Sequence, residues 1–268
     1  MFLEYLKYII YGLIQGFTEF IPVSSTAHLK VVSLIFGIDD PGPSLSAIIQ
    51  LGSVFALIYY FKNDFFKLGN YFSQKNFDYL INKRLLCSIL IATLPIFLLG
   101  GTIKLFAPYF FDYFLRSNFS IALVSLLMAI FMYIADRSKR GPLNLTNHKL
   151  SDSFFIGLTQ AFAIIPGVSR SGITISTALL SGWERGDAAK FSFLLGIPAI
   201  SFAAIVEFIS SFNEFSSFSF YPLIVGLITT FLSSLFAIDF LLKYFSSNGL
   251  KLFIIYRVIF SVVILLNL

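Results

Sequence analysis

Six segments of the sequence are apolar over about the 20 residues that an α-helix needs to cross the hydrocarbon core of a bilayer. Charged residues make up only 12% of the chain, whereas soluble domains carry roughly 25%. The sequence therefore predicts an all-α polytopic membrane protein, whose partner is the lipid bilayer and not nucleic acid. The six predicted spanning helices lie at residues 44–61, 85–107, 118–135, 191–210, 221–242 and 250–267.

Two further apolar segments, residues 4–38 and 153–182, are each interrupted near the middle by proline and a cluster of hydroxyl-bearing residues. Inside a bilayer, the backbone polar groups freed by such a break must be buried in protein or line a wet cavity. We therefore expect each segment to form a re-entrant helix hairpin, which returns to the membrane face from which it entered.

The loops predict the orientation of the chain in the membrane. If both hairpins are re-entrant, the loops that hold most of the lysine and arginine all lie on one face, and segment 211–220 on the other face has neither residue. Because cytoplasmic loops collect basic residues, the basic face is predicted to be cytoplasmic and both termini to lie outside. The basic loops are 62–84, 136–152, 183–190 and 243–251.

An internal repeat relates the two interrupted segments. A shift of 145 positions aligns residues of the first segment with identical residues of the second. The repeats would cover about 1–140 and 150–268 of a single membrane domain, 1–268, and three crossings per repeat would invert the second copy. Inverted repeats with interrupted helices place a binding site near the bilayer midplane. The aligned residues are Gly12, Leu13, Gln15, Phe17, Val23 and Ser24 with Gly157, Leu158, Gln160, Phe162, Val168 and Ser169.

The first tip, residues 16–29, has the sequence GFTEFIPVSSTAHL. Pro22 ends one helix, and the hydroxyls that follow can cap the next helix, whose N-terminus attracts an anion. Helical spacing places Gln15 and Glu19 on one face, four residues apart, and brings His28 close to Ser24 and Ser25. Candidate phosphate-binding hydroxyls here are Ser24 and Thr26, beside Ser25.

The second tip, residues 166–177, has the sequence PGVSRSGITIST. Proline and glycine break the helix, and Arg170 supplies a fork of donors that suits phosphate. An arginine inside a membrane costs roughly 2.5 to 17 kcal/mol, so it needs a partner or an anionic ligand. The candidate phosphate-binding residues of this tip are Ser169, Arg170, Ser171 and Thr174.

The same residues could instead have structural roles. Glu19 and Arg170 could form an ion pair without chemistry, His28 could only donate a hydrogen bond, and any single hydroxyl could bond a carbonyl one turn back. The occurrence of both polar clusters at equivalent repeat positions favours a functional site. Other charged residues in the spanning segments are interpreted as near helix ends, where side chains reach the interface, and Asp39 and Asp40 as a loop. These weaker candidates are Lys104, Glu207, Asp239 and Arg257.

The sequence resembles the undecaprenyl-pyrophosphate phosphatases, the bacitracin-resistance family of bacterial inner membranes, in QGFTEFIPVSSTAHL at 15–29 and PGVSRSGIT at 166–174. The resemblance implies a multi-pass hydrolase of the bacterial plasma membrane. Its substrate would be the polyprenyl lipid undecaprenyl diphosphate, from which it removes the terminal phosphate, and its cofactor a divalent cation, Mg²⁺ or Ca²⁺.

The resemblance also assigns roles to residues. The acidic motif maps to Gln15 and Glu19 as metal ligands, although many members have Glu at the position of Gln15. We expect Glu19, Ser25, His28 and Arg170 to be catalytic. The preferred hypothesis makes Ser25 the nucleophile and His28 the base that takes its proton, and the alternatives are attack by His28 itself or by water.

Two rival functions would use similar features. An inverted-repeat transporter or lipid-carrier flippase would need the anion site but no nucleophile. The type-2 phosphatidic acid phosphatases need a histidine after their Ser-Arg pair, and residues 171–185 contain none. A homodimer is compatible with the sequence and is left open.

Overall fold

The computed structural model describes residues 2–64, 77–106, 115–139, 141–210 and 218–266. Within these ranges the chain is helical, and its only β-type pairing is an isolated bridge between Leu143 and Trp183. The element order is α1 (Phe2–Phe20), α2 (Ser25–Phe36), α3 (Gly42–Tyr60), α5 (Phe77–Phe106), α6 (Asn118–Arg137), α7 (Leu150–Gln160), the 3₁₀ helix η3 (Ala161–Ile164), α8 (Arg170–Leu180), α9 (Arg185–Ser210), α10 (Phe220–Ser247) and α11 (Lys251–Leu266).

Five helices of the described part, α3, α5, α6, α9 and α10, are long and apolar enough to cross a membrane. Each coincides with a predicted span. The sixth predicted span, 250–267, corresponds to α11, which has 16 residues and is shorter than the other five. The chain is therefore a polytopic membrane protein, as predicted, and the sixth crossing remains a prediction.

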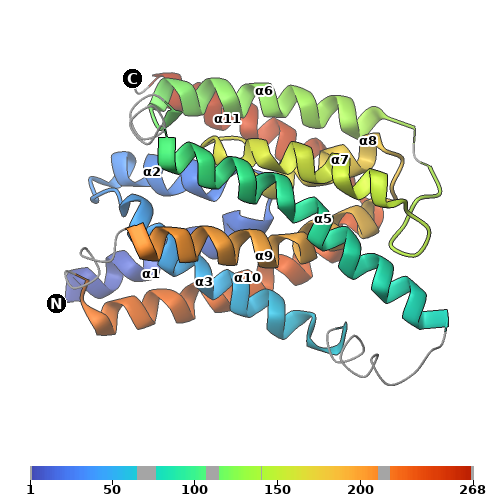
Figure 1. Ribbon diagram of the computed structural model, residues 1–268. Coiled ribbons are helices and arrows are strands. Elements are labelled where there is room, and N and C mark those ends of the chain that lie inside the picture. Colours follow the sequence, from blue (N-terminus) through green and yellow to red (C-terminus); the bar gives the residue numbers. More distant parts are fainter. Residues whose placement is uncertain (1, 65–76, 107–114, 140, 211–217, 267–268) are drawn as a thin grey trace.

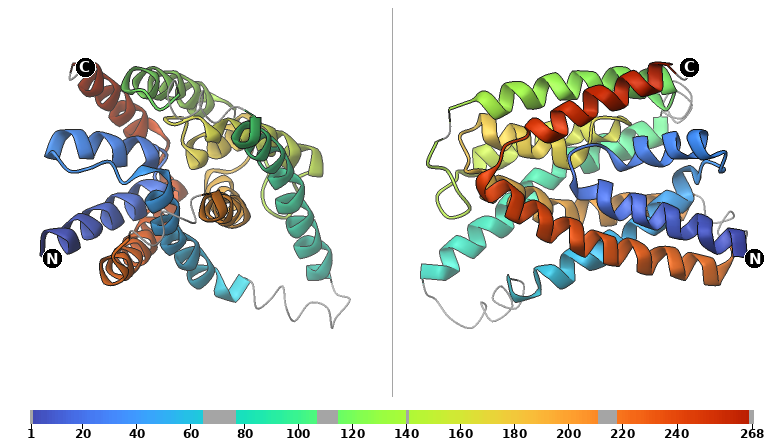
Figure 2. Two further views of the ribbon diagram at one scale, coloured as in Figure 1. Left: turned by 60° about the vertical axis from the view of Figure 1, so that its left-hand side comes forward. Right: turned by 180° about the vertical axis from the view of Figure 1, so that it is seen from behind.

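The helices run roughly along one direction, and both termini lie at the same end of the bundle (Figure 1; Figure 2, right). The connections at the opposite end follow α3, α6, α8 and α10, and the described basic residues on which the predicted orientation rests lie in them or in the neighbouring turns of the helices. Lys67, Lys75 and Arg140, which belong to that set, lie outside the described residues. We call these two ends the terminal end and the basic end.

Both interrupted segments are helix pairs that turn back. Helices α1 and α2 both reach the terminal end, whereas α7 and α8 both reach the basic end (Figure 1). In the first pair, helix stops at Phe20 and resumes at Ser25. In the second pair, α7 continues into η3 and helix resumes at Arg170. The two breaks interact directly, because the Gly167 N–H donates to Ser24 Oγ at 3.3 Å.

Ser24 and Ser169 are the only non-glycine residues with positive φ in the described part of the chain, at 78° and 70°. This conformation costs a residue with a side chain on the order of 1–3 kcal/mol. Each serine lies immediately before the helix that follows its break, at positions that the 145-residue shift aligns. The same strained turn therefore occurs in both copies of the predicted repeat.

Glycine residues allow α1 and α7, the first helices of the two interrupted segments, to pack closely on helices of the other predicted repeat. Helix α1 packs on α10, and α7 packs on α5. A Cβ added at Gly12 would lie 2.6 Å from the Gly226 carbonyl oxygen, and one added at Gly157 would lie 2.4 Å from that of Ala92. Gly12 and Gly157 are again aligned by the 145-residue shift, so the two contacts correspond.

We predict that Gly12→Ala lowers the unfolding free energy of the detergent-solubilised protein by about 1–3 kcal/mol, because backbone of α10 must move to admit the methyl group. Thermal unfolding measures the effect. Gly186→Ala is the matched control, since nothing lies within 4 Å of its added Cβ. Equal stability of the two variants would contradict this packing.

Candidate functional site

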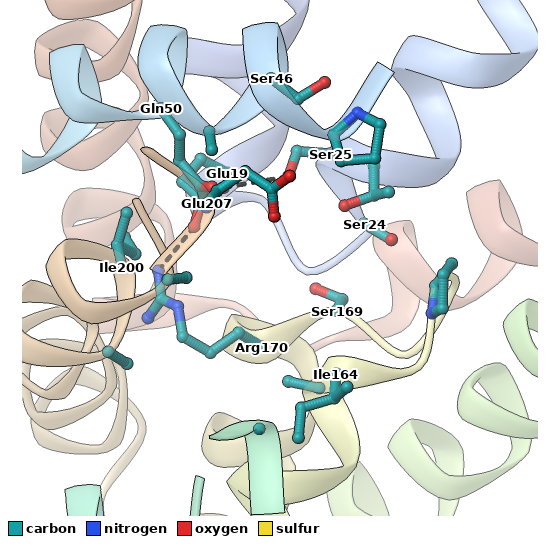
Figure 3. Close-up of a pocket in the computed structure, with 18 of the residues that line it drawn as sticks. Glu19, Ser24, Ser25, Ser46, Gln50, Ile164, Ser169, Arg170, Ile200 and Glu207 are labelled. Carbon is teal, nitrogen blue, oxygen red and sulfur yellow. Dashed lines mark hydrogen bonds and ion pairs between the residues drawn. The ribbon is translucent and has the colours of Figure 1, made fainter. Parts of the chain in front are cut away.

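A cavity of about 350 Å³ lies between the two breaks and extends toward the terminal end of the bundle. Its walls include both tips, the first turns of α3 and the last turns of α9 (Figure 3). The polar and charged lining residues are Thr18, Glu19, Ser24, Ser25, Thr26, Ser46, Gln50, Arg116, Ser169, Arg170 and Glu207. The remaining lining residues are apolar or glycine.

The Glu19 carboxylate is the centre of the polar network. Its Oε2 accepts hydrogen bonds from Gln15 Nε2 at 2.8 Å, Ser25 Oγ at 2.9 Å and Gln50 Nε2 at 3.0 Å. Its Oε1 accepts from the Arg170 guanidinium at 3.1 Å, and this bond joins the two tips. Both side chains of the ion pair are buried, with 5% of Glu19 and 9% of Arg170 exposed. The ion pair predicted as a structural alternative is thus present, and it lies in the cavity wall.

Arg170 is held in place by α9. Its Nη1 donates to the Ser192 carbonyl at 2.9 Å. A Cβ at Gly196 would lie 2.5 Å from Nη1, so a glycine is needed where the guanidinium crosses α9. The Arg170 Nε is buried without a hydrogen-bond partner among the described residues.

The predicted phosphate-binding hydroxyls divide into two sets. Ser24, Thr26 and Ser169 line the cavity together with Ser25. Ser171 and Thr174 are fully buried and lie outside the lining. Thr174 donates to the Arg170 carbonyl at 2.8 Å, which fixes the first turn of α8. Their predicted contact with phosphate is untested, and their observed contacts are structural.

His28 points away from the cavity. Its Nδ1 lies 2.7 Å from the Ser24 carbonyl oxygen, and its Nε2 lies 2.6 Å from the Tyr256 hydroxyl. The ring also stacks on Phe260, with centroids 4.3 Å apart. Since the Ser25 hydroxyl donates to Glu19, the structure places a carboxylate where the sequence predicted an imidazole. A catalytic role for His28 remains a prediction.

Arg257 differs from its sequence interpretation. Its side chain is fully buried, and its guanidinium is bonded to backbone carbonyls instead of being exposed at a helix end. It donates to Pro22 O at 2.9 Å, to Gly167 O, to Val168 O at 3.3 Å and to Ser125 O at 3.3 Å. Pro22 and Gly167 are aligned by the 145-residue shift, so one guanidinium binds equivalent carbonyls of both breaks. An arginine inside a membrane is energetically costly unless it has partners, and this signal in the sequence could have identified Arg257 as a buried residue with several partners.

The other weak candidates also have defined places. Glu207, on α9, lines the cavity. Asp239 pairs with Lys243 at 2.6 Å, away from the cavity. Asp39 and Asp40 form a loop, as predicted, and pair with Lys7 and Arg116. The Lys104 side chain lies outside the described residues.

The lining suits a divalent cation bound together with a phosphate ligand. The described residues contain no group of three His, Cys, Asp or Glu that could hold a metal by themselves. Glu19 and Glu207 nevertheless bring two carboxylates to one cavity, and Mg²⁺ is commonly held by one or two carboxylates and substrate phosphates. Gln15, the other predicted ligand, directs its amide N–H to Glu19 and is absent from the lining.

The fold and the cavity define a polytopic membrane protein with a cavity lined by an ion pair and several hydroxyls. Residues 8–263 match the family model described as "Bacitracin resistance protein BacA", and the chain belongs to that family. An undecaprenyl-diphosphatase of Prochlorococcus marinus (strain MIT 9312) is 79% identical over 268 residues, which cover 100% of both chains. One from strain MIT 9303 is 47% identical over 269 residues, covering 96% of this chain and 89% of the relative.

We predict that Arg257→Met lowers the unfolding free energy by about 2 kcal/mol or more, because several buried carbonyls lose their donor. Arg257→Lys should recover part of the loss, since an ammonium can reach one of the two breaks. Lys251→Met, at an exposed position of the same helix, is the control and should be near neutral. Denaturation in detergent measures all three, and an Arg257→Met variant as stable as the control would contradict the assigned role.

Proposed function

We propose that the cavity between the two breaks is where this chain, an undecaprenyl-diphosphatase by its family and its relatives, removes the terminal phosphate of undecaprenyl diphosphate. The activity follows from the BacA match and from the 79% identical relative. The observation that most supports this location of the site is the 3.1 Å contact between Glu19 and Arg170. It joins the two motifs of the sequence in one cavity, with the Ser25 hydroxyl beside them.

We infer that the architecture is an inverted repeat of six crossings and two re-entrant hairpins in the bacterial plasma membrane. Three pairs of aligned features support it, namely the strained serines, the close-packed glycines and the carbonyls bound by Arg257. With the basic end in the cytoplasm, the cavity faces the outer leaflet. The polyprenyl tail would then lie among the apolar helices, in the bilayer.

Charge stabilisation at the terminal phosphate would come from several donors. The Arg170 fork and the N-terminus of α8, which begins at this residue, both face the cavity and suit the equatorial phosphate oxygens. The hydroxyls of Ser24, Thr26 and Ser169 add neutral donors. Because these groups are fixed by the two breaks before the substrate binds, little reorganisation is needed as charge develops.

The hydrogen bond from Ser25 to Glu19 supports a serine nucleophile with a carboxylate base. In this hypothesis Ser25 Oγ forms a bond to the terminal phosphorus, Glu19 takes the hydroxyl proton, and the bridging P–O bond breaks. Undecaprenyl phosphate leaves as the monophosphate. Water then hydrolyses the phosphoserine, which releases inorganic phosphate and restores the hydroxyl. Attack by His28 or by water remains the alternative.

Glu19 and Glu207 are the residues that would hold the divalent cation, Mg²⁺ or Ca²⁺. When bound, the cation supplies positive charge that neutralises the diphosphate oxygens. The ion pair with Arg170 keeps the Glu19 carboxylate directed into the cavity. A transporter or flippase would need the same anion site, but transport does not require the hydrogen bond between the Ser25 hydroxyl and the Glu19 carboxylate.

The test is phosphate release from polyprenyl diphosphate by the purified protein, with Mg²⁺ or Ca²⁺ supplied and then chelated. Arg170→Ala should lower kcat/KM at least about a hundredfold, since a transition-state donor is lost. Arg185→Ala is the matched control, because Arg185 also pairs with a carboxylate, Asp136, but lies outside the cavity. Near wild-type turnover of Arg170→Ala, in folded protein, would refute the site. No release by the wild type under any of these conditions would favour a transporter.

Ser25→Ala and Glu19→Gln should both lose at least about a hundredfold in kcat, because the nucleophile or its base is removed. Tyr256→Phe, which changes only the hydrogen bond at His28, should have a much smaller effect. Rapid quenching with labelled substrate followed by mass spectrometry should find phosphate on Ser25. Full activity of Ser25→Ala would instead assign the attack to His28 or water.

A further inference from the structure

We propose that Arg116 binds the lipid-linked phosphate of the diphosphate substrate, as a second guanidinium at the outer part of the same cavity. The proposal rests on the proposed function, because it assigns the substrate group that Arg116 contacts. Arg116 belongs to neither motif of the sequence. It precedes α6, at the terminal end of the bundle, and it lines the cavity together with Pro43 and Ser46 from the first turns of α3.

The cavity therefore has a cationic group at each end. Arg170 lies beside the two breaks and shares Glu19 with Ser25, whereas Arg116 comes just before α6, which begins at the terminal end of the bundle. A diphosphate whose terminal phosphorus is at Ser25 must direct its other phosphate, and the lipid attached to it, toward the opening. That direction leads to Arg116. A guanidinium presents a planar fork that binds two phosphate oxygens at once.

The present contacts of Arg116 leave it able to exchange partners. Its Nη2 lies 3.3 Å from Asp40 Oδ2, and the two side chains are 13% and 39% exposed. An ion pair with one partner exposed to this degree contributes at most about 1 kcal/mol. Asp40 is not part of the cavity lining, and its other oxygen accepts a hydrogen bond from the Gly42 N–H. A phosphate in the cavity can thus replace Asp40 without disturbing the loop.

A second cation strengthens the positive potential at this end. The Lys30 ammonium donates a hydrogen bond to the Arg116 carbonyl oxygen. Lys30 and Arg116 therefore both lie near the Asp40 carboxylate, which cannot neutralise the two of them. Within the cavity, Arg170 is already paired with Glu19, so Arg116 and Lys30 supply the further positive charge that attracts an anionic headgroup, and they do so beside the Glu207 carboxylate of the same lining.

The matched variants are Arg116→Gln and Asp40→Asn, which break the same ion pair from its two sides. Arg116→Gln should raise KM for polyprenyl diphosphate about tenfold, the effect of about 1.4 kcal/mol, with a smaller change in kcat. It should weaken inhibition by polyprenyl monophosphate similarly and leave inhibition by inorganic phosphate unchanged. Asp40→Asn should leave KM unchanged or lower it, because the guanidinium is released. Arg116→Lys, which lacks the fork, should fall between.

An unchanged KM in Arg116→Gln would overturn the proposal. A rise of KM in Asp40→Asn equal to that in Arg116→Gln would also overturn it, because the ion pair between the two residues would then have only a structural role. Weaker inhibition by inorganic phosphate in Arg116→Gln would also overturn it, since Arg116 would then bind the terminal phosphate. Thermal unfolding confirms that the variants are folded. If the wild type releases no phosphate but binds polyprenyl monophosphate through Arg116, measured by native mass spectrometry, the proposed reaction fails and the Arg116 contact remains.

Discussion

The Arg257 guanidinium satisfies backbone carbonyls that both helix breaks leave without partners. A break inside a bilayer exposes polar backbone groups to a medium that offers no hydrogen bonds. Pro22 and Gly167, one from each break, are bound by the same side chain. Because a single buried group joins them, the breaks are held against each other, and one part of the cavity lies where they meet. The cost of burying this charge is thus part of how the site is built.

The contacts between the breaks explain why the strained serines are tolerated. Ser24 accepts a hydrogen bond from the Gly167 N–H, and Ser169 caps its own helix through Gly172. Each turn directs the start of a helix and its neighbouring side chains into the shared space. Glu19 and Arg170 then meet across the repeat, and the Ser25 hydroxyl of the first tip donates to the same carboxylate (Figure 3). The proposed site therefore lies beside the two residues with positive φ, and strained backbone of this kind is common at functional sites.

Hydropathy and proline placement predicted most of the architecture. The five long spans, both breaks and the meeting of Glu19 with Arg170 were all predicted, because each follows from chain-local signals and from the repeat. Contacts between distant helices were not predictable in this way. His28 lies four residues from Ser24, yet a partner on α11, Tyr256, orients its ring. The burial of Arg257 and the presence of Glu207 and Arg116 in the cavity lining were not predicted, because position along the chain does not reveal which side chains face a cavity.

In the proposed reaction, the terminal phosphate is attacked in the cavity between the two breaks. A structure of the protein with a methylene-bridged polyprenyl diphosphonate, which cannot be hydrolysed, would locate that phosphate. We expect the terminal phosphonate within hydrogen-bonding distance of both Ser25 Oγ and the Arg170 guanidinium. A diphosphonate bound elsewhere, with Glu19 and Arg170 still paired and no contact to either break, would contradict it.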